Sequence, residues 1–174
     1  MKFKSRLFFA LKPAEELSLK LLELGCTLKS KSHERVTEPE MLHMTLRYIG
    51  HTDEEIKQSL LTDVDSISVP SFDIRLNRTG YWKKPQVIWC APEITDNILI
   101  KLVSQLEEIC QKNGINAEKK LFKPHVSLLR KVKSFNAESQ VKLPLWRVSD
   151  FVLLESISTG NGVQYNELKR WNLI

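Results

Sequence analysis

The distribution of apolar and polar residues in the first part of the chain is typical of a strand followed by a helix. Residues 5–11 are apolar and aromatic without a helical period, which favours a buried strand. Pro13 and the two glutamates after it predict a helix that begins there and ends at Gly25. Residues 27–41 show no period and predict a mobile basic loop, which either covers a phosphate site or is simply solvated.

The next segments predict three strands and the start of a second helix. Residues 42–49 alternate and are followed by Gly50, which predicts a strand ending there. The spacing of Thr52 and Glu55 is that of a capping box and predicts a helix start. Two further strands are predicted at 67–78 and 85–91, around a break at 80–84.

The second half of the chain repeats the same kinds of pattern. Apolar residues recur at helical spacing over 94–110, and Asn113-Gly114 predicts the end of that helix. Residues 124–129 predict a short strand, and 148–157 with 162–168 predict a hairpin around Thr159-Gly160-Asn161-Gly162. Three helices or fewer with seven or eight strands indicate an α+β fold with antiparallel pairing.

The order of these elements suggests an internal duplication. Each half contains a strand, a helix, a loop and a strand that opens with a related triplet, His43-Met44-Thr45 in the first and His125-Val126-Ser127 in the second. The two histidines are 125 − 43 = 82 residues apart, close to half of the chain. Such a repeat can place equivalent strands side by side across a pseudo-twofold axis, so that equivalent residues face one crevice.

Composition narrows the class of protein without choosing a function. The 174 residues predict one domain, 1–174, and the net charge of +5 suits a polyanionic partner. Three cysteines without a C-x-x-C pair indicate neither a disulfide framework nor a zinc site, so a reducing cytoplasm is expected. The apolar part of the stretch Met1–Ala10 is too short for a signal peptide, and no apolar run approaches the ~20 residues of a membrane span.

The two triplets carry the candidate chemistry. Strand alternation puts His43 and Thr45 on one face, and His125 and Ser127 likewise, with apolar residues on the other face. If the polar faces meet, one neutral imidazole can take a proton from water while a protonated one gives a proton to a departing oxygen. The hydroxyls would donate hydrogen bonds to phosphate oxygens, so phosphodiester cleavage needs no metal and no cofactor here.

Other uses of these residues fit the sequence less well. A single histidine in an apolar strand is usually a packing residue, but two matched triplets at equivalent places favour a function. Acidic or thiol metal ligands are absent near both motifs. The sequence also has no G-x-S-x-G turn, Walker loop or G-x-G-x-x-G motif, and His33 and His51 are expected at the surface.

The chain resembles the two-histidine (2H) phosphoesterase superfamily, and within it the family of bacterial RNA 2′,3′-cyclic phosphodiesterases, also called the 2′-5′ RNA ligase family. The resemblance spans nearly the whole chain and rests on motifs that occur in the family's order. They are the opening residues 6–11, the two histidine segments 42–50 and 122–130, and the closing Glu155-Ser156 with Tyr165, Leu168 and Trp171.

The resemblance implies a bilobal α+β fold, with two pseudo-symmetric lobes whose antiparallel sheets line a central groove and whose helices lie outside. It also implies hydrolysis of a terminal 2′,3′-cyclic phosphate of RNA to a 2′-phosphate. In that reaction His43 would be the general acid toward the 3′ oxygen and His125 the general base toward water. Thr45 and Ser127 would hold the phosphate.

Three further residues are candidates for contact with RNA. Arg130 matches a family position that contacts the RNA end, whereas simple strand alternation favours Arg47, which shares the parity of His43. Phe9, or its neighbour Phe8, is the candidate for stacking on a terminal base.

The expected partner is RNA with a 2′,3′-cyclic phosphate or a small cyclic nucleotide, bound by a monomer without an obligate protein or membrane partner. Two alternatives stay open at this point. One is a non-catalytic module that binds RNA ends, and the other is 2′-5′ ligation of RNA by the same site.

Overall fold

The computed structural model describes residues 5–136, 138–160 and 162–174, which form three α-helices, two 3₁₀ turns and eleven strands. Several strands are short, which explains why the sequence pattern predicts fewer. The strands are β1 Ser5–Leu11, β2 Arg35–Val36, β3 Met44–Thr52, β4 Phe72–Ile74, β5 Leu76–Trp82, β6 Val87–Pro92, β7 Val126–Arg130, β8 Ser139–Gln140, β9 Trp146–Val148, β10 Asp150–Thr159 and β11 Gly162–Asn172. The helices are α1 Glu15–Leu28, α2 Glu54–Asp63 and α3 Asn97–Lys112, and the turns are η1 Pro39–Met41 and η2 Val64–Ser66.

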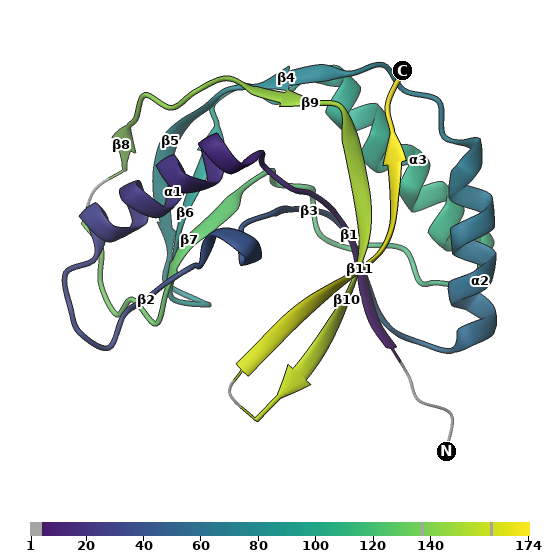
Figure 1. The fold of residues 1–174 in the computed structure, drawn as a ribbon, viewed down its shortest axis with the longest axis horizontal. Helices are drawn as coiled ribbons and strands as arrows, with labels where there is room; N and C mark the ends of the chain where they lie inside the picture. The colour runs from purple at the N-terminus through teal and green to yellow at the C-terminus, as the bar shows by residue number, and fades with distance from the viewer. Residues whose placement is uncertain (1–4, 137, 161) are drawn as a thin grey trace.

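One curved sheet of nine strands organises the molecule (Figure 1). Its order is β11-β10-β1-β3-β7-β6-β5-β8, with β2 added beside β7, while β4 and β9 form a separate pair. All of these pairings are antiparallel. The predicted α+β class with antiparallel sheets is therefore confirmed.

The two half-repeats meet at the middle of this sheet and exchange their helices. The units β1-α1-β3 and β6-α3-β7 have the same order of elements, and β3 pairs with β7. However, α1 packs on β7 and α3 packs on β3, so each helix covers the sheet of the other unit. Figure 1 shows α1 over the end of the sheet that holds β5, β6 and β7, and α2 and α3 at the opposite end. This exchange ties the halves together.

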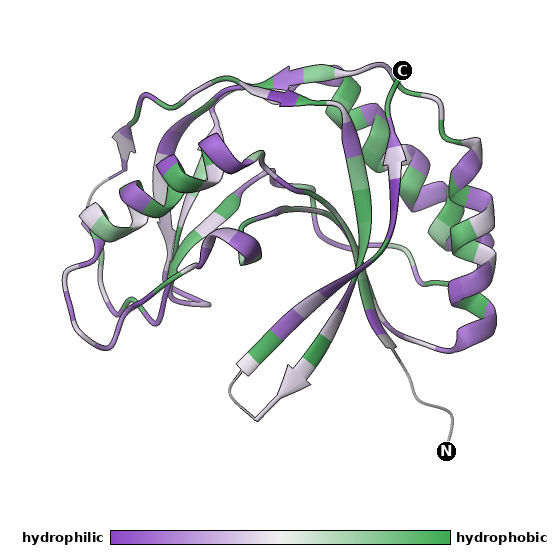
Figure 2. Cartoon of the chain, viewed as in Figure 1, coloured by the Kyte–Doolittle hydropathy of each residue, from purple (hydrophilic) through white to green (hydrophobic). Residues whose placement is uncertain are grey.

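The two faces of the sheet have different roles. On the helix-covered face a large core forms, with Leu17 and Leu21 of α1 and Leu102 and Leu106 of α3 packed on the strands. Among the described residues, the other face carries two small apolar clusters, one around Phe8 and one around Trp89. Figure 2 shows apolar residues along the strands and on the inner sides of the helices, with polar residues outside. One sheet face thus remains available for polar chemistry.

Two glycines were expected to end elements and do not. Gly25 lies inside α1, where a Cβ atom would be 2.9 Å from Cγ1 of Val36 and 3.4 Å from the carbonyl oxygen of Leu128. Its role is to let α1 approach β7 closely. Gly50 lies inside β3 with a positive φ of 84°, at an irregular part of the β1–β3 ladder. Both strand and helix therefore continue past the residue that the pattern suggested as their end.

Several predicted boundaries also shift. Asp53, and not Thr52, caps α2: its carboxylate accepts a hydrogen bond from the Ile56 amide at 3.1 Å. The strand expected at 67–78 is divided into β4 and β5, and the break expected at 80–84 begins only after Trp82. Strand patterns show where apolar residues alternate but not where pairing stops.

The segment 27–41 contains more structure than a basic loop. The carboxylate of Glu34 accepts hydrogen bonds from the amides of Ser30 and Lys31, at 2.7 and 3.0 Å. β2 then pairs with β7, and η1 leads into β3. This corrects the prediction of an aperiodic loop, because the segment adds a short strand beside β7.

Two predictions fall partly outside the described residues: the N-terminal stretch that includes Met1, and the hairpin turn that includes Asn161. The hairpin itself is present, with Thr159 paired to Gly162. Within the described ranges, no helix has the length and apolar character required to cross a membrane.

We predict that Gly80→Ala destabilises the protein by about 1–3 kcal/mol, the usual cost of overpacking a core. An alanine Cβ at this position would lie 2.2 Å from Cζ2 and 2.4 Å from Cη2 of the Trp89 ring. Urea unfolding monitored by circular dichroism measures the change. Gly160→Ala is the matched control, because a Cβ there meets nothing within 4 Å. Equal stability of the two variants would contradict this packing.

Candidate active site

The join between β3 and β7 brings the two histidine triplets together. Met44 pairs with Val126, and both strands begin directly after their histidine. In an antiparallel pair, this register sets His43 beside Ser127 and Thr45 beside His125. The two histidines are then diagonal neighbours, for which backbone separations of about 7–8 Å are usual. Such a spacing leaves room for one phosphate group between the imidazoles.

A small pocket opens at this join. It is lined by residues from four parts of the chain, namely Thr37, Met41, His43, Ser127, Arg130 and Tyr165. His43 and Ser127 therefore line one cavity, although 84 residues (127 − 43) separate them in the chain. The prediction that the polar faces of the two triplets meet agrees with this geometry.

Both imidazoles are held in the same way. Nδ1 of His43 lies 2.7 Å from the carbonyl oxygen of Met41, and Nδ1 of His125 lies 2.8 Å from that of Lys123. Because a carbonyl only accepts hydrogen bonds, Nδ1 carries the proton in each neutral ring. This leaves Nε2 of each ring to accept a proton or, once protonated, to donate one.

Aromatic rings pack against both imidazoles. The ring of His43 lies 5.2 Å from that of Phe8 and 5.1 Å from that of Tyr165, the latter edge to face. The ring of His125 lies 4.4 Å from that of Trp82, at an angle of 73°. These contacts restrict the rotation of both imidazoles and shield them from water.

Burial changes the proton affinity of both histidines. Burial is the main reason that the pKa of His43 is lowered to about 4; the charge of Arg130 acts in the same direction, and the hydrogen bond to Met41 opposes it. Burial also lowers the pKa of His125, with a smaller contribution from Arg130. Both rings are therefore neutral in the free protein at neutral pH. A bound phosphate anion would favour the protonated form of either ring.

A β-bulge explains the position of Arg130. In the β6–β7 ladder Ile88 pairs with Leu129 and Trp89 with Ser127, so Leu128 is an extra residue. The extra residue reverses the alternation, and Arg130 comes to lie on the face of His125 and Ser127. Its side chain is exposed and lines the pocket with His43. Simple alternation had placed it on the opposite face.

The same kind of bulge makes the Arg47 prediction wrong. Phe9 pairs with Arg47 and Ala10 with Thr45, so Leu46 is the extra residue of β3. Arg47 therefore turns toward the helices, where it is only 5% exposed and forms an ion pair with Glu107 of α3.

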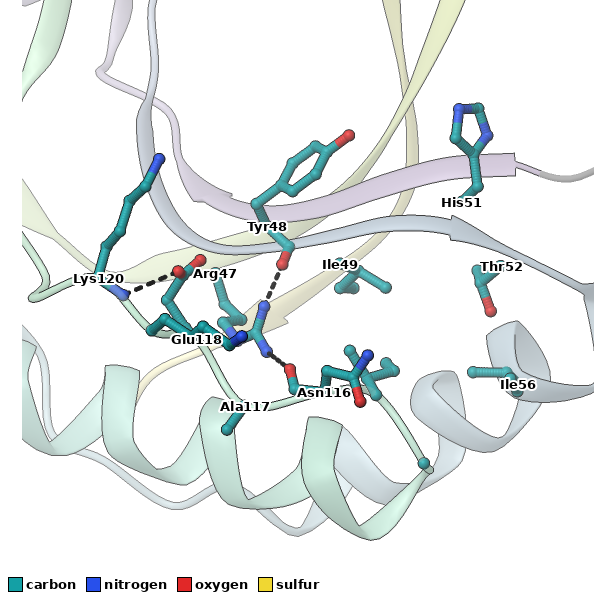
Figure 3. A pocket seen from close by; sticks show the side chains of 13 residues that line it. Arg47, Tyr48, Ile49, His51, Thr52, Ile56, Asn116, Ala117, Glu118 and Lys120 are labelled. Atoms are coloured by element: carbon teal, nitrogen blue, oxygen red, sulfur yellow. Dashed lines mark hydrogen bonds between the residues drawn. The ribbon is translucent and has the colours of Figure 1, made fainter.

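Figure 3 shows the Arg47 guanidinium hydrogen-bonded to the backbone oxygens of Tyr48 and Asn116, the latter at 2.7 Å. It borders a separate pocket of about 510 Å³ between β3 and residues 114–120. That pocket lies behind the sheet and does not include either catalytic candidate histidine.

The proposed stacking role of Phe9 is also wrong. Phe9 is fully buried in the large core, with its ring 6.4 Å from Phe151 and 6.0 Å from Trp171. Phe8 lies on the face of His43 but is only 4% exposed, and Tyr165 packs against its other edge at 5.0 Å. Phe8 therefore supports the imidazole and has no free ring face for a base.

Sequence reasoning did not identify several residues that border the site. Tyr165 of β11 contacts His43, and Trp82 of β5 contacts His125. Both lie far from the triplets in the chain, and only strand pairing brings them near. His33 and His51 are exposed, as expected. Among the described residues, no three or more His, Cys, Asp or Glu side chains gather as metal ligands would.

Comparisons with known proteins agree with this arrangement. The family model described as "LigT like Phosphoesterase" matches residues 11–89. A protein of Escherichia coli (strain K12) named RNA 2′,3′-cyclic phosphodiesterase is 27% identical, with 97% of this chain and 96% of that protein aligned. A protein of the same name from Aeropyrum pernix is 29% identical, over 77% of this chain and 83% of that protein.

Solved structures are similar over the whole chain. The crystal structure of E. coli LigT complexed with 3′-AMP has a TM-score of 0.89 at 25% identity, covering 98% of this chain and 99% of that one. A crystal structure titled phosphoesterase has a TM-score of 0.90 at 26% identity, with the same coverage. By these comparisons and by the geometry of its two histidine triplets, the chain is similar to the LigT-like phosphoesterases over nearly its full length.

Proposed function

We propose that this protein is an RNA 2′,3′-cyclic phosphodiesterase that hydrolyses a terminal cyclic phosphate to a 2′-phosphate. The observation that carries the proposal is the register of β3 and β7, in which Met44 faces Val126 and one residue of each triplet, His43 and Ser127, lines the same pocket. The relatives named above carry this activity in their names, and the chain aligns with the E. coli protein over nearly its full length.

The reaction follows from the groups at the join. The cyclic phosphate would lie between the imidazoles, with the hydroxyls of Thr45 and Ser127 donating hydrogen bonds to its non-bridging oxygens. A neutral histidine takes a proton from water as the new bond between oxygen and phosphorus forms. The protonated histidine donates its proton to O3′ as the bond between phosphorus and O3′ breaks. No atom of a metal or cofactor is needed for this balance.

The assignment of the two roles follows the family resemblance, with His43 as general acid and His125 as general base. For His43 this role has an electrostatic requirement, because burial lowers its pKa to about 4 in the free protein. The negative charge of the bound phosphate must raise that pKa before His43 can act as an acid near neutral pH. Arg130, at the rim of the same pocket, would balance the charge that develops on the phosphate oxygens.

The proposal also covers the compartment in which the protein acts and the substrate that it binds. We propose that the protein acts in the cytoplasm, which agrees with three unpaired cysteines among the described residues. The proposed substrate is RNA or a small nucleotide that ends in a 2′,3′-cyclic phosphate, bound by a monomer.

We predict that His43→Ala and His125→Ala each lower kcat by about 10²–10⁴-fold, the contribution of a positioned acid or base. The assay follows an oligonucleotide with a 2′,3′-cyclic phosphate in excess EDTA and resolves the 2′-phosphate product. His51→Ala is the matched control, since His51 is exposed and borders the pocket behind the sheet. Salt-sensitive binding without turnover in the wild type would instead favour an RNA-end-binding module.

We predict a bell-shaped pH profile of kcat/KM that lies below the usual range for histidine catalysis. The free protein is productive with one neutral and one protonated ring, a state that is most populated between the two pKa values. The profile should rise through about pH 4, where the doubly protonated site loses its first proton, and fall above the lowered pKa of His125. Between these values the form with the proton on His43 is a constant fraction of the singly protonated site. The kcat profile should lie at higher pH, because bound phosphate favours protonation. A kcat/KM that falls only above the ordinary histidine pKa of about 6.5 would contradict this.

The two arginines should have separable effects. Arg130→Ala is expected to lower kcat/KM by about 10–100-fold, the range for a lost hydrogen bond to a charged group. Its free energy of unfolding should not change. Arg47→Ala should leave kcat/KM near the wild-type value but cost about 1–3 kcal/mol of stability, since it removes the ion pair with Glu107 and the hydrogen bonds to the carbonyl oxygens of Tyr48 and Asn116. Enzyme assays and urea unfolding of both variants test this contrast. A lower kcat/KM of the folded Arg47→Ala protein would contradict this contrast.

A further inference from the structure

A row of polar side chains crosses the sheet face opposite the helices, next to the active site. In the β1–β10 ladder Arg6 pairs with Ser156, and in the β10–β11 ladder Ser156 pairs with Tyr165. Residues that pair in this way point to the same face and lie side by side. Phe8 and Leu154, two positions away on β1 and β10, belong to the apolar cluster of this face, which identifies the side on which the row lies.

The guanidinium of Arg6 has a neutral partner and no acidic one. Its Nη2 atom donates a hydrogen bond to Oγ of Ser156 at 2.8 Å. Among the residues that the structure describes, no carboxylate forms an ion pair with Arg6 or Arg130. Glu167 of β11 points to the same face, but its carboxylate binds Arg170 at 2.7 and 2.9 Å. Because a guanidinium carries five N–H donors, Arg6 can bind a further acceptor.

Tyr165 connects this row to the active site. Its ring lies 5.1 Å from that of His43, edge to face, and it lines the same pocket as Ser127 and Arg130. Burial raises the pKa of Tyr165, and the positive charges of Arg130 and Arg6 oppose this rise. The phenol is therefore protonated at neutral pH, and it lies close enough to both guanidiniums for their charges to act on it. It can donate its hydrogen bond to an anion that either arginine binds.

The guanidiniums of Arg6 and Arg130, both near one phenol, favour the binding of an anion. Their like charges repel each other, and an anion that binds near both of them offsets this repulsion. Arginine and tyrosine side chains are common donors to the phosphate oxygens of nucleic acids. The pocket beside His43 measures only about 40 Å³, so a second anionic group would bind outside it, toward Arg6.

The opposite side of the site has a different pattern of charge. A larger pocket, of about 330 Å³, borders His125 and is lined by Arg78 and Lys123, but also by Glu93 and Glu138. The two carboxylates balance the two cations, so an anion gains less there. The row that contains Arg6 is therefore the better place for a second phosphate group.

We propose that Arg6 and Tyr165 bind a second phosphate group of the RNA, a phosphodiester that lies next to the reacting cyclic phosphate. The inference rests on the proposed function and adds a substrate preference to it, namely for an RNA end over a single cyclic nucleotide. The phosphodiester has two possible sources, which share the same chemistry. It belongs either to the strand that carries the cyclic phosphate or to a separate strand that lies along the same face.

The experiment compares two substrates that differ only in the charge of one linkage. They are adenylyl-adenosine 2′,3′-cyclic phosphate and its analogue with a neutral methylphosphonate in place of the phosphodiester. If the phosphodiester belongs to the substrate strand, wild type should have a kcat/KM about 10–100-fold higher for the charged substrate, the range for hydrogen bonds to a charged group. Arg6→Gln should abolish this preference, Tyr165→Phe should lower it, and Arg6→Lys should keep most of it. Arg75→Gln is the matched control, because Arg75 is an exposed arginine between β4 and β5.

The second arm tests a separate strand as the source. In that case the two substrates should differ little, but adenylyl-adenosine should inhibit the hydrolysis of adenosine 2′,3′-cyclic phosphate more strongly than its methylphosphonate analogue does. Arg6→Gln should remove this difference. Because each variant is measured with a charged and a neutral compound, a change in its folded fraction cancels in the comparison. The proposal is overturned if charged and neutral compounds behave alike in both assays, or if Arg6→Gln retains the preference for charge.

A direct binding measurement keeps this test independent of turnover. If wild type hydrolyses neither substrate, the proposed function fails, but calorimetric titration with the 3′-phosphate of adenylyl-adenosine and with its methylphosphonate analogue still tests the subsite. Wild type should bind the charged compound more tightly. The slope of log Kd against log salt for that compound should be smaller by about 0.7 in Arg6→Gln, the value for one phosphate contact on a single strand. Equal affinity of wild type for both compounds, or the same slope in wild type and Arg6→Gln, would overturn the subsite.

Discussion

The register of β3 against β7 is the constraint on which the rest of the structure depends. Met44 and Val126 face each other across an antiparallel pair, so each histidine lies beside the hydroxyl residue of the other triplet. A shift of one residue would turn His43 and Thr45 into the core and Met44 onto the open face. Burial of Met44 and Val126 between the helices and the sheet opposes such a shift. The same apolar contacts that stabilise the fold therefore hold the polar groups around one phosphate-sized space.

The duplicated backbone supplies the symmetry of the site, and the side chains supply its asymmetry. Leu46 and Leu128 form equivalent bulges, and the residues two positions after them, Tyr48 and Arg130, both come to the open face. Only Arg130 carries a charge, and it lies at the pocket of His43. The neighbouring strands differ in the same manner, with Ala10 in one half and Trp89 in the other. A symmetric acid and base pair is thereby placed in surroundings that distinguish the two sides of the phosphate.

The sequence predicts the elements and the triplets well, because both depend on local periodicity. Alternation around His43 and His125 identifies the faces correctly within two residues of each histidine. Beyond that point the bulges reverse the alternation, so alternation alone puts Arg47 and Arg130 on the wrong faces, since a bulge depends on the partner strand. The exchange of α1 and α3 between the halves, the close approach at Gly25 and the contacts of Tyr165 and Trp82 are long-range features as well. None of them leaves a periodic signal in the chain.

Burial of the imidazoles links the fold to the chemistry. Aromatic rings and the core remove water from both histidines, and this lowers the pKa of each ring and leaves it neutral in the empty site. The positive charge of Arg130 acts in the same direction on both rings. An anion that binds between them reverses this balance, because it is attracted by Arg130 and favours a proton on an adjacent imidazole. The negative charge of the substrate thus favours the one protonated imidazole that the acid step requires, while the other imidazole stays neutral and can act as the base.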